Sequence, residues 1–217
     1  LGKGQQLKFQ SNFGDEFTAY DISFAEPYLY GRDLYIKTDL YSELQDSATV
    51  NYETEKIGFG IALGFPLSYD QRITTKYSLF NDKTTADSDA TSYEKLLAGT
   101  TTVSSIGYSF SSDKRNSPYK PSAGYKYILN QDLAGLGGDS FFIKSTIDYT
   151  YYKRLSKTLI GSLKLNGGHL NGYNNKYAPI SSYFQLGGNK LRGFQSQRIG
   201  PKTGNSYTGG QYFYLTS

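Results

Sequence analysis

KIGFGIALGF, residues 56–65, alternates large apolar side chains with small or polar ones over ten consecutive positions. Successive side chains of an extended strand point to opposite faces, so the large residues share one face. These are Ile57, Phe59, Ile61, Leu63 and Phe65. The other face is mostly Gly and Ala, which indicates that another group needs the space above it. The stretch therefore predicts a β-strand with one apolar face and one crowded face.

The same alternation recurs along almost the whole chain and predicts about ten strands. Residues 33–44 and 140–152 are the clearest further examples. The other predicted strands cover residues 5–13, 17–25, 72–80, 102–110, 125–130, 158–168 and 210–217. Helical spacing occurs only briefly, at residues 92–97, inside a polar connection. We therefore expect an all-β, antiparallel protein.

The connections between the predicted strands alternate between short and long. Tight turns are expected at residues 30–32, 66–70, 116–124 and 154–157, and longer polar links at 45–51, 81–101, 131–139 and 171–209. Outer-membrane barrels have short turns on one side and long loops on the other. Strands of about 9 to 13 residues also suit a tilted membrane span better than a soluble sheet. The fold class that we predict is a transmembrane β-barrel.

Tyrosines near the strand ends support this prediction, because amphipathic rings favour the headgroup level of a membrane. They are Tyr28, Tyr30, Tyr41, Tyr52, Tyr69, Tyr119, Tyr125, Tyr151, Tyr152 and Tyr212. The alternative is a soluble lectin-like or lipocalin-like β protein, whose strands also alternate. No run of apolar residues is long enough for a transmembrane helix.

Composition argues against several classes of function. The 217 residues contain no Cys and a single His, His169, so we expect no disulfide framework, no metal site, no cofactor and no enzyme activity. The net charge of +4 is interspersed along the chain, and we expect no nucleic-acid partner. The chain begins at Leu1 rather than Met, so we interpret it as an internal fragment and draw nothing from the lack of a signal peptide.

The longest predicted link, residues 171–209, contains the stretch GGNKLRGF at residues 187–194. Connections of this length in compact folds are usually functional or disordered. This link also carries Tyr183, Phe184, Leu186 and Ile199, more apolar weight than a disordered segment supports. We therefore expect it to be folded against another part of the protein.

Residues 187–201, GGNKLRGFQSQRIGP, resemble the signature loop of the BamA family of outer-membrane protein assembly factors and of its wider superfamily of barrel insertases and transporters. The resemblance implies that this motif forms the tip of a long extracellular loop that folds back into the barrel lumen. The candidate site residues in the motif are Gly187, Gly188, Leu191, Arg192, Gly193 and Phe194.

Three further stretches, residues 24–32, 63–67 and 119–125, are similar to turns of the same family and occur in the order that the family demands. The resemblance thus covers nearly the whole chain. The family barrel has more strands than the ten predicted here. We therefore expect residues 1–217 to be the central part of a larger barrel, without its terminal strands and without the periplasmic POTRA domains of the family.

The chemistry of Arg192 fits a structural role in such a loop. A guanidinium inside a barrel needs acceptors, and its planar fork is best satisfied by paired carboxylate or backbone oxygens. Gly193 suits a sharp backbone reversal, and Phe194 supplies an apolar anchor. We expect the acidic partner of Arg192 on a later strand that this sequence does not contain. The alternative is an ordinary surface turn with one arginine.

The resemblance implies a non-enzymatic machine that assembles and inserts β-barrel proteins into the bacterial outer membrane. Client strands would pair with an unstable barrel seam while the bilayer is locally thinned. The implied partners are unfolded barrel clients, outer-membrane lipids and lipoproteins of the assembly machinery. Two alternatives remain within outer-membrane barrels, namely a superfamily transporter that exports a single partner polypeptide and a passive porin-type channel. A soluble glycan-binding β protein is the third alternative.

Overall fold

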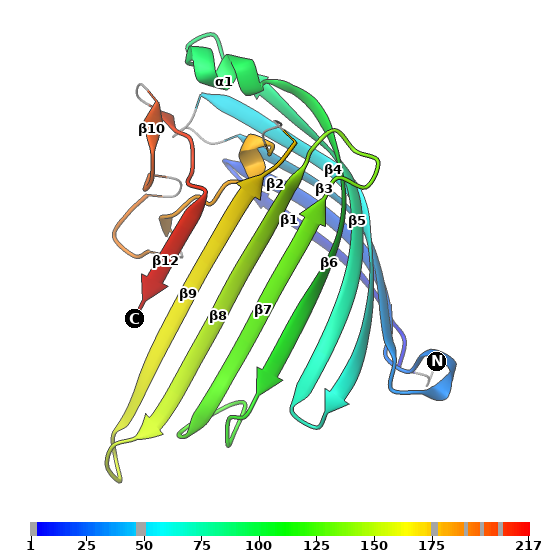
Figure 1. Ribbon diagram of the computed structural model, residues 1–217, viewed down its shortest axis with the longest axis vertical. Helices are drawn as coiled ribbons and strands as arrows, with labels where there is room; N and C mark the ends of the chain where they lie inside the picture. Colours follow the sequence, from blue (N-terminus) through cyan, green and yellow to red (C-terminus); the bar gives the residue numbers. More distant parts are fainter. Residues whose placement is uncertain (1–3, 47–50, 175–177, 189–190, 196–197, 204–205) are drawn as a thin grey trace.

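One ten-stranded antiparallel sheet dominates the computed structural model, which describes residues 4–46, 51–174, 178–188, 191–195, 198–203 and 206–217 (Figure 1). The order of the strands in the sheet follows the order of the sequence. The strands are β1 (Gln6–Gly14), β2 (Phe17–Glu26), β3 (Tyr35–Asp46), β4 (Tyr52–Ser68), β5 (Gln71–Ala86), β6 (Gly99–Asp113), β7 (Gly124–Ala134), β8 (Phe142–Arg154), β9 (Ile160–Gly172) and β12 (Tyr212–Thr216). The prediction of an all-β fold with about ten strands is confirmed.

Four small elements lie in the connections. The 3-10 turn η1 (Leu29–Gly31) joins β2 to β3, and helix α1 (Ser92–Leu97) lies between β5 and β6. The long connection from β9 to β12 contains the 3-10 turn η2 (Ile180–Ser182) and a small hairpin, β10 (Lys202–Thr203) with β11 (Ser206–Tyr207). No helix in the described ranges is long and apolar enough to span a membrane.

Helix α1 confirms the brief helical signal in the sequence. The Thr91 hydroxyl accepts a hydrogen bond from the Glu94 backbone, and the Glu94 carboxylate accepts one from the Thr91 backbone at 2.7 Å. This reciprocal pair satisfies two donors that a helix start leaves free. The strands on either side are longer than predicted, because β5 continues to Ala86 and β6 begins at Gly99. The connection is therefore residues 87–98, not 81–101.

The turn predicted at residues 66–70 is shorter than expected. Strand β4 continues to Ser68, and only Tyr69 and Asp70 form the turn, so the family-like stretch 63–67 is strand. The pairing of β4 with β5 shifts register between Pro66 and Ser68. A proline has no backbone N–H to donate to a neighbouring strand and is tolerated beside such a bulge.

The connections define two rims of the sheet. We call the rim at residues 27–34, 69–70, 114–123 and 155–159 the turn rim, and the opposite end of the strands the loop rim. The loop rim carries the connections at residues 87–98, 135–141 and 173–211, together with a tight turn at Asp15 and Glu16. Two connections of the turn rim, residues 27–34 and 114–123, are longer than residues 135–141 on the loop rim, so the predicted alternation of short and long connections holds only in part.

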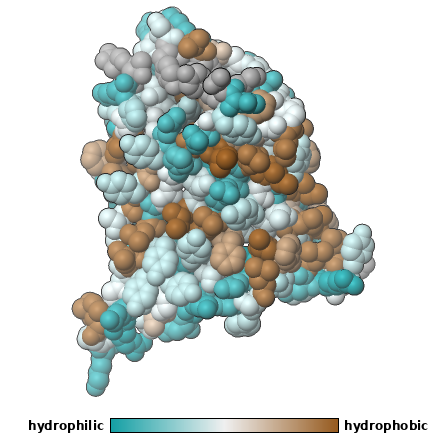
Figure 2. Space-filling view, viewed as in Figure 1, coloured by the Kyte–Doolittle hydropathy of each residue, from teal (hydrophilic) through white to brown (hydrophobic). Residues whose placement is uncertain are grey.

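The two faces of the sheet differ in polarity. Residues that are register partners on neighbouring strands point to the same face of the sheet. One row of such partners from β3 to β8 lies on the inner, concave face and consists of Lys37, Ala62, Lys76, Gly107, Asp132 and Lys144. Lys76 and Asp132 form an ion pair at 2.8 Å across Gly107. The outer face exposes apolar side chains, which Figure 2 shows as brown areas over the front strands. They include Leu40, Ile57, Phe59, Leu79, Ile106, Leu133, Ile143 and Ile147.

An apolar outer face and a polar inner face are the arrangement of a transmembrane β-barrel wall. The crowded face predicted for residues 56–65 is the inner one. A Cβ atom added at Gly60 would lie 2.7 Å from an Asp39 carboxylate oxygen, and one added at Gly58 would lie 2.4 Å from the Phe80 Cβ. Large side chains of the two neighbouring strands therefore occupy the space above the small residues of β4.

The main hydrophobic core lies between the inner face and the long connection, near the loop rim. Its buried residues are Val103, Ala134, Phe142, Leu170, Ala178 and Phe184. The first four come from β6 to β9, and the last two come from the connection after β9. The predicted packing of this connection against the rest of the protein is thereby confirmed. Figure 1 shows the turn η2, in orange, on the concave side of the sheet, while β10 lies beside the edge strand β12.

Candidate functional site

The docking segment, which we define as residues 178–186, attaches the long connection to the inner wall. Pro179 directly precedes η2, and the backbone is extended at Tyr183, just after that turn. Its side chains and carbonyls contact β4, β5 and β8, and its backbone pairs with Gly210 just before β12. It thus connects β4 and β5 in the middle of the sheet with β8 and with the edge strand β12.

The first anchor is a carboxylate on β5. The Asp82 side chain is only 1% exposed, and one of its oxygens accepts a hydrogen bond from the Ser181 hydroxyl. The other oxygen has no hydrogen-bond partner among the described residues. Lys56, the register partner of Asp82 on β4, places a positive charge on the same face. Because a buried carboxylate is costly without partners, the Ser181 hydroxyl is important for the position of this segment.

Two more polar anchors lie on β8 and β4. The Lys144 ammonium donates to the Ser182 carbonyl at 2.8 Å and lies 5.0 Å from the centroid of the Phe184 ring. The amide of Gln185 donates to the Tyr52 hydroxyl at 2.9 Å. A cation over an aromatic face adds an attraction of roughly 0.5–2 kcal/mol. These contacts span the lumen between strands that are not neighbours in the sheet.

Phe184 provides the apolar anchor. Its ring packs on Phe213 of β12 with centroids 4.8 Å apart, above Gly168 of β9. A Cβ atom at Gly168 would lie 2.6 Å from the Phe184 ring, so only glycine permits this close approach. The Phe184 N–H donates to the Gly210 carbonyl, and the Gly210 N–H donates in return, both at 2.9 Å. Phe184 is consequently held by side chain and backbone together.

The motif predicted as the site follows the docking segment along the connection. Gly187 and Gly188 have φ values of 119° and 56°, and the Gly188 N–H donates to the Phe194 carbonyl at 2.9 Å. Gly193 has a φ of 89°, which suits the sharp reversal expected there. Asn189 and Lys190, inside the same stretch, lie outside the described residues.

Arg192 and Phe194 are both exposed in this chain, Phe194 to 55%. No carboxylate of the described residues lies within ion-pair distance of Arg192. The wall contacts described above come from the docking segment instead. The bracing role of Arg192, and the site role of Leu191, therefore stay predictions.

Sequence reasoning did not single out Ser181, Asp82 or Lys144. The alternation of β5 and β8 places Asp82 and Lys144 on the inner face, so their orientation could have been inferred from the sequence. Their partner could not, because Ser181 lies 99 residues from Asp82 along the chain.

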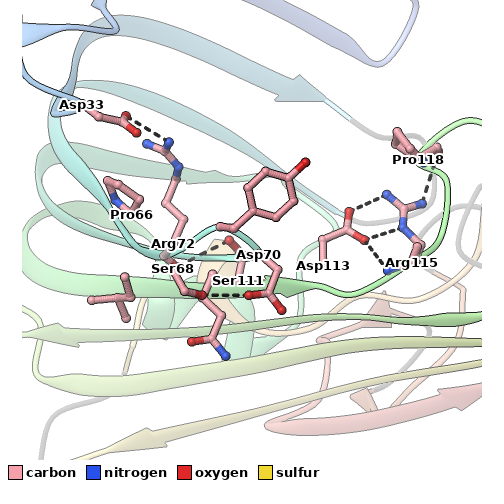
Figure 3. Close-up of a pocket in the computed structure, with 12 residues that line it drawn as sticks. Asp33, Pro66, Ser68, Asp70, Arg72, Ser111, Asp113, Arg115 and Pro118 are labelled. Atoms are coloured by element: carbon pink, nitrogen blue, oxygen red, sulfur yellow. Dashed lines mark hydrogen bonds and ion pairs between the residues drawn. The ribbon is translucent and has the colours of Figure 1, made fainter.

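A second concave region lies at the turn rim, an open cleft of about 810 Å³. Figure 3 shows Arg72 directed toward Asp33, and Arg115 toward Asp113, with distances of 3.4 Å and 2.6 Å. The Ser68 hydroxyl donates to Asp70 at 2.8 Å and lowers the pKa of that carboxyl, with a smaller contribution from Lys114. Each of these carboxylates thus has a cationic or hydroxyl partner, which suits structural ion pairing better than acid-base catalysis.

Comparison with known proteins gives consistent results. The family model described as the Omp85 superfamily domain matches residues 1–217. The sorting and assembly machinery component 50 homolog of Mus musculus is 27% identical over 216 residues, which are 99% of this chain and 46% of that protein. The outer membrane protein assembly factor BamA of Neorickettsia risticii is 28% identical over 179 residues, which are 81% of this chain and 24% of that protein.

Among solved structures, the crystal structure of BamA from Haemophilus ducreyi lacking POTRA domains 1–3 has a TM-score of 0.89 to this chain at 19% sequence identity. The match covers 100% of this chain and 47% of the solved one. At this identity the likeness shows the fold, a β-barrel wall. The chain spans about half the length of the mouse relative.

Proposed function

The chain belongs to the Omp85 superfamily, and we propose that it forms the wall and the lumen loop of a machine that inserts other β-barrel proteins into an outer membrane. Its relatives include a sorting and assembly machinery component and an outer membrane protein assembly factor, whose names support this assignment. The proposed role is non-enzymatic. Insertion of a client would depend on strand pairing and on the shape of the wall, without a catalytic residue.

The observation that carries the proposal is the docked loop. Ser181, Ser182 and Gln185 connect β5, β8 and β4 across the lumen, so the curvature of the wall is tied to the position of the loop. A barrel that must open and close against client strands needs its remaining wall held rigid. An unpaired strand edge in lipid has unsatisfied backbone groups and will template a neighbouring strand.

The partners that follow from this role are unfolded barrel clients, membrane lipids and accessory proteins of an assembly complex, with lipoproteins among them in a bacterium. The membrane is an outer membrane. The BamA relatives favour that of a bacterium, as the sequence predicts, and the animal relatives favour that of a mitochondrion. Cell fractionation with markers for both membranes would distinguish the two.

The experiment that tests the function is depletion of the full-length protein in its own cells. Folded barrels migrate differently from heat-denatured ones on a gel, so the folded fraction of several unrelated barrels can be measured together. We expect all of them to decline, and re-expression of the intact protein to restore them. Loss of one secreted polypeptide alone would indicate a dedicated transporter, and loss of small-solute uptake alone would indicate a porin.

A further inference from the structure

The tip of every turn on the turn rim carries a large exposed side chain. Tyr30, Tyr69 and Tyr119 are each at least 90% exposed, and Leu155 and Leu159 are exposed in the turn between β8 and β9. These side chains extend beyond the ends of the strands. Transfer of aromatic and aliphatic groups at such positions from water into the interfacial region of a bilayer is favourable.

Outer-face tyrosines mark where that interface lies. Tyr125 and Tyr151 are register partners on β7 and β8, and Tyr127 and Tyr149 form the next row toward the loop rim. The rings of Tyr125 and Tyr149 are 6.0 Å apart. Amphipathic rings in such rows form the aromatic girdle of a membrane barrel. The headgroups of the adjacent leaflet are therefore expected just beyond Tyr125 and Tyr151.

Exposed lysines lie at the expected level of these headgroups. Lys153 is on the same outer face as Tyr151 and two residues further along β8, roughly 7 Å closer to the turn rim. Lys157 lies in the following turn, and Lys120 lies beside Tyr119. Within the described part of the chain, none of these three lysines has a carboxylate in ion-pair distance. Lys114 and Arg115, in contrast, pair with Asp70 and Asp113.

The connections at the loop rim carry charges of both signs. The exposed acidic residues there are Asp15, Asp87, Asp89 and Asp139, with Asp46 at the end of β3, and the exposed basic residues are Lys95, Arg192, Arg198 and Lys202. Lys83, near the same rim, is paired with Glu55 at 3.6 Å. The exposed charges of the described loop-rim residues are therefore nearly balanced, whereas lysines are in excess at the turn rim over β6 to β9. This difference favours negatively charged headgroups at the turn rim.

We propose that the turn rim over β6 to β9 is a docking surface for anionic phospholipid headgroups, with Lys120, Lys153 and Lys157 as the contacts to phosphate. The neighbouring tyrosines and leucines insert at the level of the headgroups. A soluble polyanion would give these apolar groups no such contact. The inference rests on the transmembrane fold and on the rim charges. It does not depend on the proposed role in barrel assembly.

The test uses the full-length protein in nanodiscs that contain phosphatidylcholine and phosphatidylglycerol at about three to one. After gentle transfer to detergent, lipid mass spectrometry gives the ratio of the two lipids that remain bound. A lysine near an anionic surface strengthens binding roughly fivefold. We expect native protein to enrich phosphatidylglycerol, and Lys153→Gln/Lys157→Gln to lower the bound ratio at least about twofold.

The matched control is Lys83→Gln/Lys95→Gln, which removes the same charge at the loop rim and should keep the native lipid ratio. Equal ratios in all three proteins, or an equal decrease in both variants, would overturn the proposal. Loss of the enrichment with millimolar inorganic phosphate would assign the lysines to a free-anion site and also overturn it. If the double variant does not fold, Lys120→Gln alone gives the same comparison, with Lys83→Gln as its control.

Discussion

Ser181→Ala should destabilise the barrel, because this hydroxyl is the donor to a carboxylate that is 1% exposed. Without it, Asp82 would be buried with no hydrogen-bond partner among the described side chains. We expect a loss of about 1–3 kcal/mol in the free energy of unfolding. The measurement is the denaturant midpoint of the fast-migrating folded band in unheated gels.

Ser88→Ala is the control for this substitution, because the Ser88 hydroxyl donates to the exposed Asp89 at 3.2 Å. Its effect should stay within about 0.5 kcal/mol, as for other surface positions. Equal midpoints for the two variants would mean that the hydrogen bond to Asp82 does not hold the loop.

Arg192→Ala in the full-length protein should lower barrel stability or assembly activity, if the guanidinium finds its acidic partner on a strand beyond this chain. Hydrogen bonds to charged groups contribute about 1.5–3 kcal/mol, and we expect a loss in that range. Heat-modified gel mobility and cell growth are the readouts. Arg198→Ala, an exposed arginine of the same loop, is the control. Unchanged growth and heat stability would argue for a simple surface turn at Arg192.

The docking segment can be tested as an element by replacing residues 178–186 with a glycine–serine segment of equal length. The strands should still form, because their pairing and alternation do not depend on the loop. The lumen would lose its anchors at Asp82, Lys144 and Tyr52 together with the apolar contacts of Phe184. We therefore expect a lower melting temperature and a larger ion conductance in planar bilayers.

A scrambled sequence of residues 87–98 is the matched control for the segment replacement, because this connection also lies at the loop rim. It should affect conductance less than the loss of the docking segment. If both variants conduct like the native barrel, the docked loop does not obstruct the lumen.

At the scale of the whole molecule, the apolar outer face predicts how the protein partitions. Contiguous exposed side chains such as Leu40, Phe59 and Leu79, register partners on three adjacent strands, would be costly in water and are favourable in lipid. We expect the protein to stay in membranes during alkaline carbonate extraction and to require detergent for release. Release into buffer without detergent would instead favour the soluble β protein that the alternation of the strands also allows.

Much of the wall could be predicted from the sequence alone. The alternation at residues 56–65 and at nine similar stretches predicted the strands and their two faces, because side-chain direction in a strand depends only on position parity. The sequence signal for helix α1 is also local, since its capping box joins residues three apart. The end of β4 was missed, because Pro66 suggests a turn unless the bulge beside it is known.

The attachment of the loop could not be predicted in the same way. Residues 171–209 contain enough apolar side chains to require a packing partner, and the sequence alone predicted this. The sequence also indicated, however, that the motif around Arg192 would be the anchor. Only the tertiary structure brings Ser181 to Asp82 and Gln185 to Tyr52, pairs that are 99 and 133 residues apart. The curvature of the ten-stranded sheet decides which inner-face residues the loop meets, and that curvature is a property of all the strands together.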